Sequence, residues 1–385
     1  MPRLALPPSP ALRLSALCAA TFAGIGIYMP FFPIWLEERG IAPGAIGVIV
    51  AIPLVVRIVA TAPLVSLTER GLEARILLML AQVILAFLYL SLLGLDGAIA
   101  IGLVVALVAI AQAPLTPTVD LLITDAVRVN PDLDYGRIRL WGSLAFLACN
   151  VGAGYLLTRT SADAAVIALI VLSLIAAAVS WAAPARALDP AQQDASGKPG
   201  AVRLPSGLKW MIAGGAILQA SHATLYGFGS IEWRAQGIPE SLIGWLWAIG
   251  VIAEVALFWL IGRGVGRGGS SSRLLLLAAG AAVIRFAGLA LAPGLAATFA
   301  LQILHGLTFG ATLLGVMAAL TRYAPPGTRG KAQGLLGASV ALATASGMVL
   351  SGLAYPALGA ATYWLMVPVA LAGGVCALRG AALLR

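Results

Sequence analysis

The stretch ILLMLAQVILAFLYLSLL, residues 76–93, decides the fold class because it is apolar on every face. A helix of about 20 apolar residues crosses the roughly 30 Å hydrocarbon layer of a membrane. Strands of outer-membrane barrels alternate apolar and polar residues, which neither this stretch nor residues 167–179 do. The stretch therefore predicts a membrane-spanning helix.

Similar stretches recur along the whole chain. Hydrophobic residues make up 61% of the 385 positions and charged residues only 10%, whereas a soluble domain carries roughly 25% charged residues. The first stretch, which ends at Leu36, exceeds the roughly 7–15-residue core of a signal peptide, so we expect it to remain as a span. Twelve spans are expected, at residues 12–36, 45–67, 76–93, 98–122, 140–157, 164–183, 210–231, 241–261, 274–292, 295–320, 332–353 and 362–378.

The positive charges predict the orientation. With a cytoplasmic N-terminus, 19 of the 24 Lys and Arg residues fall in cytoplasmic segments. Three lie outside, at Arg39, Arg159 and Arg234, and two lie within spans, at Arg57 and Arg285. This positive-inside bias predicts that both termini are cytoplasmic. It also explains the net charge of +9 without a nucleic-acid partner.

The sequence divides into two repeated halves. Residues 184–209 are rich in Pro, Gly, Ser and charge, as expected of a cytoplasmic linker. They separate residues 1–183 from residues 210–385, with six expected spans in each. GIAPGAIG at 40–47 matches GIPESLIG at 237–244 at an offset of 197 residues. We therefore predict an all-α membrane protein made of two pseudo-symmetric six-helix bundles.

Charged and titratable residues inside the spans are candidates for function, because a charge at the bilayer centre costs about 2.5–3.5 kcal/mol on insertion scales. The candidates are Arg57, Asp120, Arg139, His222, Glu254, Arg285 and His305.

Glu254 and Arg285 both fall near the middle of their spans and allow two interpretations. They could form an ion pair that only locks two helices together. Alternatively, Glu254 carries a proton, because burial disfavours its charged form while a nearby arginine favours it. His305 could join this network or be a packing residue, and packing is the simpler interpretation of His222.

The repeat links Glu254 to the first half. Subtracting 197 from 254 gives Arg57, so equivalent positions carry opposite charges. We expect both to face a central cavity, where Arg57 could bind a substrate carboxylate. The alternative is that Arg57 pairs with Asp120.

Several motifs carry a resemblance to a known family. They are Trp35-Leu36 followed by Gly40, PLTPTVD at 114–120, DYGRIRLWGS at 134–143, IGWLW at 243–247 and VIAEV at 251–255. With these motifs the chain resembles the 3-phenylpropionate transporter family of the major facilitator superfamily, which is related to lactose permease and other sugar:proton symporters. The resemblance implies two bundles that bind substrate between them.

The resemblance also implies site residues. Asp120 and Arg139 match the carboxylate and arginine that bind sugar in lactose permease, and Phe146 stands where the permease stacks a tryptophan on the sugar. Glu254, Arg285 and His305 match its coupling site. The permease has a second carboxylate one turn after its histidine, and this chain has Thr308 there.

We therefore expect proton-coupled uptake of a small organic solute, such as the aromatic acid 3-phenylpropionate, by a monomer in the bacterial inner membrane. The proton gradient would drive it, without a cofactor or metal. A sugar or nucleoside symporter is the first alternative and a drug exporter the second. The sequence lacks the GxxxxGK[ST] motif of an ATP-driven pump and the HExxH motif of a metalloenzyme, so an enzyme is not expected.

Overall fold

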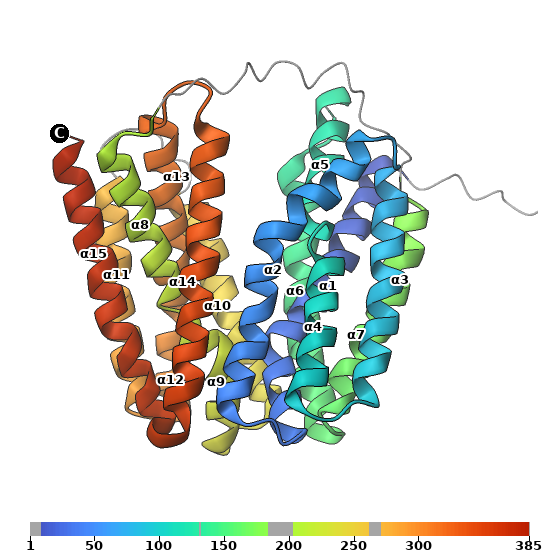
Figure 1. Ribbon diagram of the computed structural model, residues 1–385, viewed down its shortest axis with the longest axis horizontal. Coiled ribbons are helices and arrows are strands. Elements are labelled where there is room, and N and C mark those ends of the chain that lie inside the picture. The colour runs from blue at the N-terminus through green and yellow to red at the C-terminus, as the bar shows by residue number, and fades with distance from the viewer. Residues whose placement is uncertain (1–8, 131, 184–202, 262–270, 385) are drawn as a thin grey trace, which may run out of the picture.

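The computed structural model describes residues 9–130, 132–183, 203–261 and 271–384, and these are helical without strands (Figure 1). The first part comprises α1 (Pro10–Glu38), α2 (Pro43–Glu69), α3 (Ala74–Leu93), α4 (Ala98–Gln112), α5 (Leu115–Val129), α6 (Tyr135–Arg159) and α7 (Asp163–Trp181). The second comprises α8 (Ser206–Ala220), α9 (Ala223–Ala235), α10 (Glu240–Ile261), α11 (Ser271–Ala290), α12 (Leu295–Ile303), the π-helix η2 (Gly306–Ala311), α13 (Thr312–Tyr323), α14 (Arg329–Leu358), the 3-10 helix η3 (Gly359–Leu365) and α15 (Met366–Leu383). Most of the expected linker, residues 184–202, lies outside the described residues.

Ten helical stretches in the described ranges are long and apolar enough to cross a membrane. One of them, Arg329–Leu383, has 55 residues and contains both α14 and α15. The helices α8 and α9 are not among the ten, because a turn at Ser221 and His222 divides them into pieces of 15 and 13 residues. The membrane-protein class expected from the sequence is confirmed.

The expected span at 98–122 differs in detail. It continues to Val129 and is interrupted after Gln112, where α4 gives way to α5. Pro114 explains the interruption, because proline has no N–H for the helix ladder and its ring clashes with the preceding turn. The break separates Gln112, on the cavity side, from Asp120 on α5.

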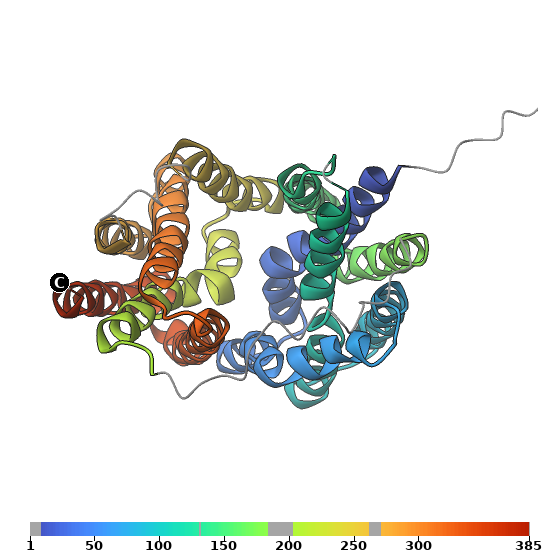
Figure 2. The same cartoon turned by 90° about the horizontal axis from the view of Figure 1, so that it is seen from above.

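The helices pack in two groups that lie side by side when seen from above (Figure 2). In the first group α1 packs on α6 and α7, α3 on α7, and α2 on α4. In the second α8 packs on α14 and α15, and α11 on α13 and α15. Fewer pairs of helices connect the two groups, chiefly α2 with α14, α6 with α10, and α1 with α9.

The repeat at 40–47 and 237–244 has the same backbone conformation in both copies. Gly40 and Gly237 have φ of 70° and 80°, in the left-handed region that glycine adopts readily. The next amide reaches back five residues in each copy, from Ile41 N–H to the Leu36 carbonyl at 3.1 Å and from Ile238 N–H to the Trp233 carbonyl at 3.0 Å. Both α1 and α9 therefore end in the same C-cap.

Glycines bring the two groups into contact at one end. A Cβ on Gly47 of α2 would lie 2.6 Å from the Met348 carbonyl oxygen of α14, and one on Gly352 would lie 2.6 Å from that of Pro43. Likewise a Cβ on Gly244 of α10 would lie 2.7 Å from the Asn150 carbonyl oxygen of α6. At these crossings only glycine allows the helices to approach so closely.

Ion pairs close the same end. Arg234, at the end of α9, pairs with Glu37 at 2.8 Å and with Glu38, both at the end of α1. Ser241 N–H donates to the Thr158 hydroxyl at 2.9 Å, which joins α10 to α6. Toward the other end α2 and α14 diverge (Figure 1), and this end is called the open end below.

We expect Gly47→Trp to hold the closed end open. Overpacking a tight contact costs about 1–3 kcal/mol, so the ratio of open to closed molecules should rise roughly tenfold. In a chain with its three cysteines replaced and Ser241→Cys introduced, alkylation of the new thiol should accelerate accordingly. Gly280→Trp is the control, because a Cβ there meets nothing within 4 Å; equal rates in both variants would contradict the prediction.

Candidate functional site

A cavity of about 490 Å³ lies between the two groups of helices. Most of its lining is aromatic or aliphatic, and its ionisable side chains other than tyrosine are two arginines, one glutamate and one histidine. The lining residues are Phe22, Ile25, Tyr28, Met29, Phe32, Pro33, Val50, Pro53, Leu54, Arg57, Gln112, Arg139, Ser143, Phe146, Tyr226, Val251, Glu254, His305, Phe309 and Met348.

Arg57 and Glu254 both line this cavity, from α2 and α10. The exposed Arg57 guanidinium donates to Gln112 Oε1 at 3.2 Å, and Gln112 Nε2 donates to the Tyr89 hydroxyl at 2.8 Å. Arg57 forms no ion pair within the described part of the chain, so the alternative in which Asp120 neutralises it does not apply. Its charge is available to a ligand.

Arg139 and Phe146 both line the cavity and lie on the same face of α6. Its guanidinium carbon lies 3.8 Å from the centre of the Phe22 ring, a cation–π contact. Its Nε is 3.9 Å from Asp120 Oδ1, which also accepts from the Tyr135 hydroxyl at 3.1 Å. Asp120 is not among the cavity-lining residues, so the structure places it behind Arg139.

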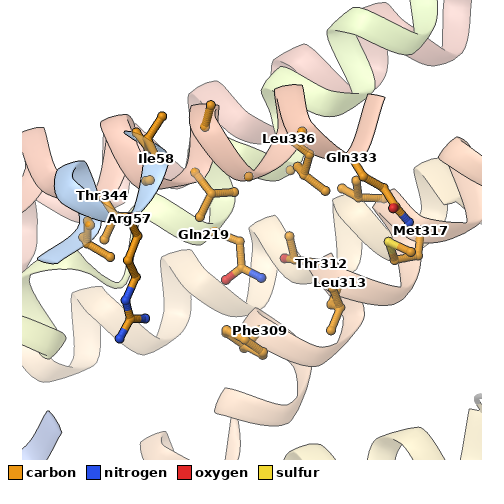
Figure 3. A pocket seen from close by; sticks show the side chains of 18 of the residues that line it. Arg57, Ile58, Gln219, Phe309, Thr312, Leu313, Met317, Gln333, Leu336 and Thr344 are labelled. Atoms are coloured by element: carbon orange, nitrogen blue, oxygen red, sulfur yellow. The ribbon is translucent and has the colours of Figure 1, made fainter. Parts of the chain in front are cut away.

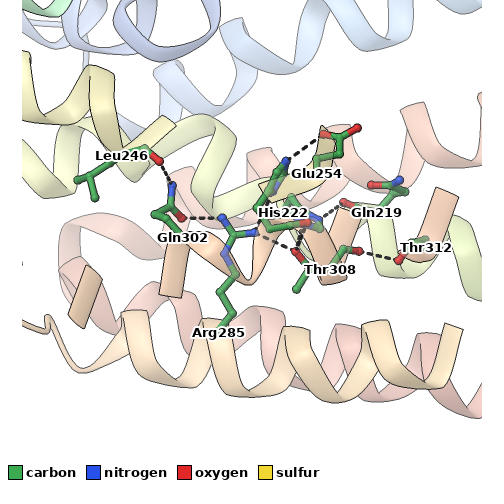
Figure 4. A network of polar contacts seen from close by, with 9 residues as sticks. Gln219, His222, Leu246, Glu254, Arg285, Gln302, Thr308 and Thr312 are labelled. Atoms are coloured by element: carbon green, nitrogen blue, oxygen red, sulfur yellow. Dashed lines mark hydrogen bonds and ion pairs between the residues drawn. The ribbon is translucent and has the colours of Figure 1, made fainter. Parts of the chain in front are cut away.

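Arg285 is fully buried in the second group and forms a network of neutral contacts (Figure 4). Its Nη1 lies 3.0 Å from His305 Nδ1 and 2.9 Å from the Thr308 hydroxyl, and its Nη2 donates to Gln302 Oε1 at 2.6 Å. It forms no ion pair with Glu254 or with any other described carboxylate. The interpretation of Glu254 and Arg285 as a locking ion pair is therefore wrong.

Glu254 instead lies beside His305, with Oε2 3.8 Å from Nε2. The two side chains are 17% and 10% exposed, so both touch the cavity while most of their surface is covered. Gly306 permits this approach, because a Cβ there would lie 2.7 Å from the Ala253 carbonyl oxygen of α10. The wider turn of η2 begins at the same glycine, and such π-helical turns occur often at functional sites.

Part of this network was not predicted from the sequence. Gln302 accepts from Arg285 and donates to the Leu246 carbonyl at 2.9 Å. His222 is not only packed: its Nε2 lies 2.9 Å from the Thr308 hydroxyl. A signal was present in the sequence, since the polar residues Gln302, His305 and Thr308 recur every three residues in a largely apolar span.

A second cavity of about 670 Å³, shown in Figure 3, adjoins the first. It lies among α2, α8, α13 and α14, and Leu54, Arg57, Tyr226 and Phe309 line both cavities. Most of its other residues are aliphatic, with Gln219, Thr312, Gln333 and Thr344 as the polar ones. Arg57 thus stands at the boundary between the two spaces.

Comparison with known proteins agrees with this architecture. Residues 11–366 match the MFS_1 like family. A probable 3-phenylpropionic acid transporter of Escherichia coli (strain K12) is 30% identical over 367 residues, which cover 91% of this chain and 92% of that protein.

Solved structures share the fold. The nucleoside transporter NupG superposes with a TM-score of 0.81 at 16% identity, covering 98% of this chain and all of that one. A bacterial homologue of the lysosomal transporter Spinster, in an inward-facing and occupied conformation, superposes with a TM-score of 0.70 at 16% identity, covering 97% and 96%. The chain therefore belongs to the MFS_1 like family, as a transporter of the major facilitator superfamily and not an enzyme.

Proposed function

We propose that this protein is a proton-coupled uptake transporter for a small aromatic carboxylic acid such as 3-phenylpropionate. The observation that carries the proposal is the cavity itself, where Arg57, which forms no ion pair with a described residue, shares an aromatic chamber with Glu254 and His305. The 30% identical relative, named as a probable 3-phenylpropionic acid transporter, supports the same substrate class.

The proposal includes twelve spans, with α4–α5, α8–α9 and α12–α13 each forming one span and α14 and α15 forming two. The positive-inside bias supports cytoplasmic termini, and the proposed setting is a monomer in the inner membrane of a bacterium. The open end of the cavity then faces the cytoplasm, and the end closed by Arg234 faces outward. This arrangement supports alternating access by rocking of the two groups.

Arg57 is the proposed anchor for the substrate carboxylate. Arg139 already has the Asp120 carboxylate at 3.9 Å and the Phe22 ring as partners, whereas the one hydrogen-bond partner of the Arg57 guanidinium among the described residues is the neutral Gln112. A guanidinium with free N–H donors binds a carboxylate in two parallel hydrogen bonds. Tyr28 and Phe32 of α1 lie on the same cavity and suit an aromatic ring.

Glu254 is the proposed proton carrier. A charged carboxylate in a closing, dehydrated cavity is costly, and a proton removes that charge. When a substrate anion neutralises Arg57 and a proton neutralises Glu254, the chamber can close around its cargo. Loss of the proton on the cytoplasmic side then favours the open state again, which couples the two fluxes.

A sugar or nucleoside symporter is less well supported. That alternative needs Asp120 and Arg139 to grip hydroxyl groups together, and Asp120 lies outside the cavity lining with Tyr135 as its partner. Export of cationic drugs is also disfavoured by a cavity with two arginines.

The proton gradient should drive uptake directly. In cells given radiolabelled 3-phenylpropionate, a protonophore should abolish accumulation, while ATP depletion at a fixed proton gradient should leave it intact. Accumulation that follows ATP instead of the gradient would refute proton coupling.

Glu254→Gln should abolish accumulation driven by a pH gradient while exchange of internal for external substrate continues, because the amide cannot carry the proton. Proteoliposomes with and without an imposed gradient measure both. Asp96→Asn is the control, since its carboxylate is 94% exposed and distant from the cavity. Undiminished accumulation in the Glu254 variant would show that another group carries the proton.

Arg57→Gln should weaken binding of the acid roughly 10- to 100-fold, because a hydrogen bond to a charged group contributes about 1.5–3 kcal/mol. Binding of the uncharged 3-phenylpropionamide should change little. Competition by acid and amide in proteoliposomes gives both values, with the exposed Arg159→Gln as the matched loss of one cation. Equal losses for acid and amide would mean that Arg57 is structural.

A further inference from the structure

Both histidines of the chain lie in one buried network. The rings of His222 and His305 are 5.5 Å apart between centroids and nearly perpendicular, at 86°. Thr308 and Arg285 connect them (Figure 4). Each ring nitrogen has its own partner. Whether that partner can donate or only accept therefore determines which ring nitrogen carries a hydrogen.

The first end of the network is the carbonyl oxygen of Gln219. It lies 3.1 Å from His222 Nδ1 and can only accept, so Nδ1 carries the hydrogen of a neutral His222. His222 Nε2 must then accept, and the Thr308 hydroxyl 2.9 Å away is its donor. The competing acceptor for that hydroxyl, the carbonyl of His305, is farther away at 3.4 Å.

The other end is the carbonyl oxygen of Leu246, which accepts from Gln302 Nε2. Gln302 therefore turns its Oε1 toward Arg285, and Arg285 Nη2 donates to it. The two hydrogens of Arg285 Nη1 remain, one for the Thr308 oxygen and one for His305 Nδ1. The two carbonyl oxygens can only accept and the guanidinium can only donate. The hydrogens of the network therefore have one possible arrangement.

His305 is the residue through which this hydrogen-bond network reaches the cavity. Its Nδ1 accepts from Arg285, because a hydrogen there would face the N–H of a cation at 3.0 Å. Its single hydrogen then lies on Nε2, the nitrogen that faces Glu254 Oε2 at 3.8 Å. The two histidines consequently carry their hydrogens on opposite nitrogens.

We propose that Thr308 and His222 are positioning residues of the proton site: with Arg285 they fix the Nε2–H tautomer of His305, so that its hydrogen is always directed at Glu254. The inference rests on the proposed function, in which Glu254 carries the proton. A hydrogen directed at the carboxylate stabilises its charged form and leaves His305 unable to accept the proton at Nε2. Glu254 remains the group that takes it up.

The position of His222 also links this network to bending of the helices. It lies at the break between α8 and α9, and Thr308 lies in the π-helix η2. The hydrogen bond between them joins two irregular points on neighbouring spans, where helices bend most readily. Bending at the α8–α9 break would therefore move Thr308 and Arg285 together with His305.

Solid-state NMR of ¹⁵N- and ¹³C-histidine-labelled protein in lipid bilayers at neutral pH tests the proposal, because the chain has only two histidines. We expect two neutral rings, one with Nδ1–H and one with Nε2–H. His222→Gln, whose amide oxygen can still accept from Thr308, should remove the Nδ1–H ring and so assign both. Two rings of the same tautomer, or a doubly protonated His305, would overturn the assignment.

Thr308→Val removes one acceptor of Arg285 Nη1, so His305 should lose its single tautomer while His222 keeps its Nδ1–H toward the Gln219 carbonyl. Accumulation driven by a pH gradient should fall about tenfold, and Thr308→Ser should restore both the tautomer of His305 and the accumulation. Thr298→Val is the matched control, because the partners of this buried hydroxyl within the described ranges are the backbone carbonyls of Pro293 and Gly294. Unchanged tautomers in Thr308→Val would overturn the positioning role. The NMR result does not depend on transport. If Glu254 is not the proton carrier, the Glu254→Gln assay shows this separately from a failure of the positioning role.

Discussion

A buried guanidinium needs acceptors for its N–H groups, and those of Arg285 come from three side chains without a carboxylate, while its Nε has no hydrogen-bond partner among the described residues. A nearby carboxylate would cancel its charge, and the pair would have little reason to respond to a proton. Gln302, Thr308 and His305 instead solvate the cation and leave it charged. Glu254 keeps its own surface on the cavity, and the packing of α10, α11 and η2 follows from holding these groups together.

The two groups of helices meet through contacts of a different kind. Glycine crossings such as Gly47 with Gly352 bury no long side chains and bring backbone against backbone. Few side chains must repack when such an interface separates, whereas the interior of each group is densely interlocked. The ion pairs of Arg234 lie at the rim, where water is close and their rupture costs little. Rigid groups joined by a shallow interface suit a rocking motion.

Most of the fold could be predicted from the sequence, because length and uniform hydrophobicity alone identify a spanning helix. The offset of 197 residues also placed Arg57 and Glu254 on one cavity, since pseudo-symmetry carries a position from one half to the other. The partner of Arg285 could not be predicted. Which acceptor a long side chain reaches depends on the rotation of its helix and on the extra residue in η2, and neither leaves a periodic signal. The surroundings of Asp120 could not be predicted either: it lies on α5, beyond the break at Pro114, 3.9 Å from Arg139 and outside the cavity lining.

The place of Arg57 on two adjoining cavities has a consequence for how selective the chamber is. In the proposed function, Arg57 binds one end of an acid, while the other end can extend into the 490 Å³ chamber or toward the 670 Å³ space beside it. Both spaces are lined largely by flexible aliphatic and aromatic side chains, which discriminate poorly between tails. In that arrangement the charge of Arg57 selects strictly for an acidic head group, whereas the apolar walls select only weakly for the length of the tail. A family of acids with different tails is expected to compete for one anchor.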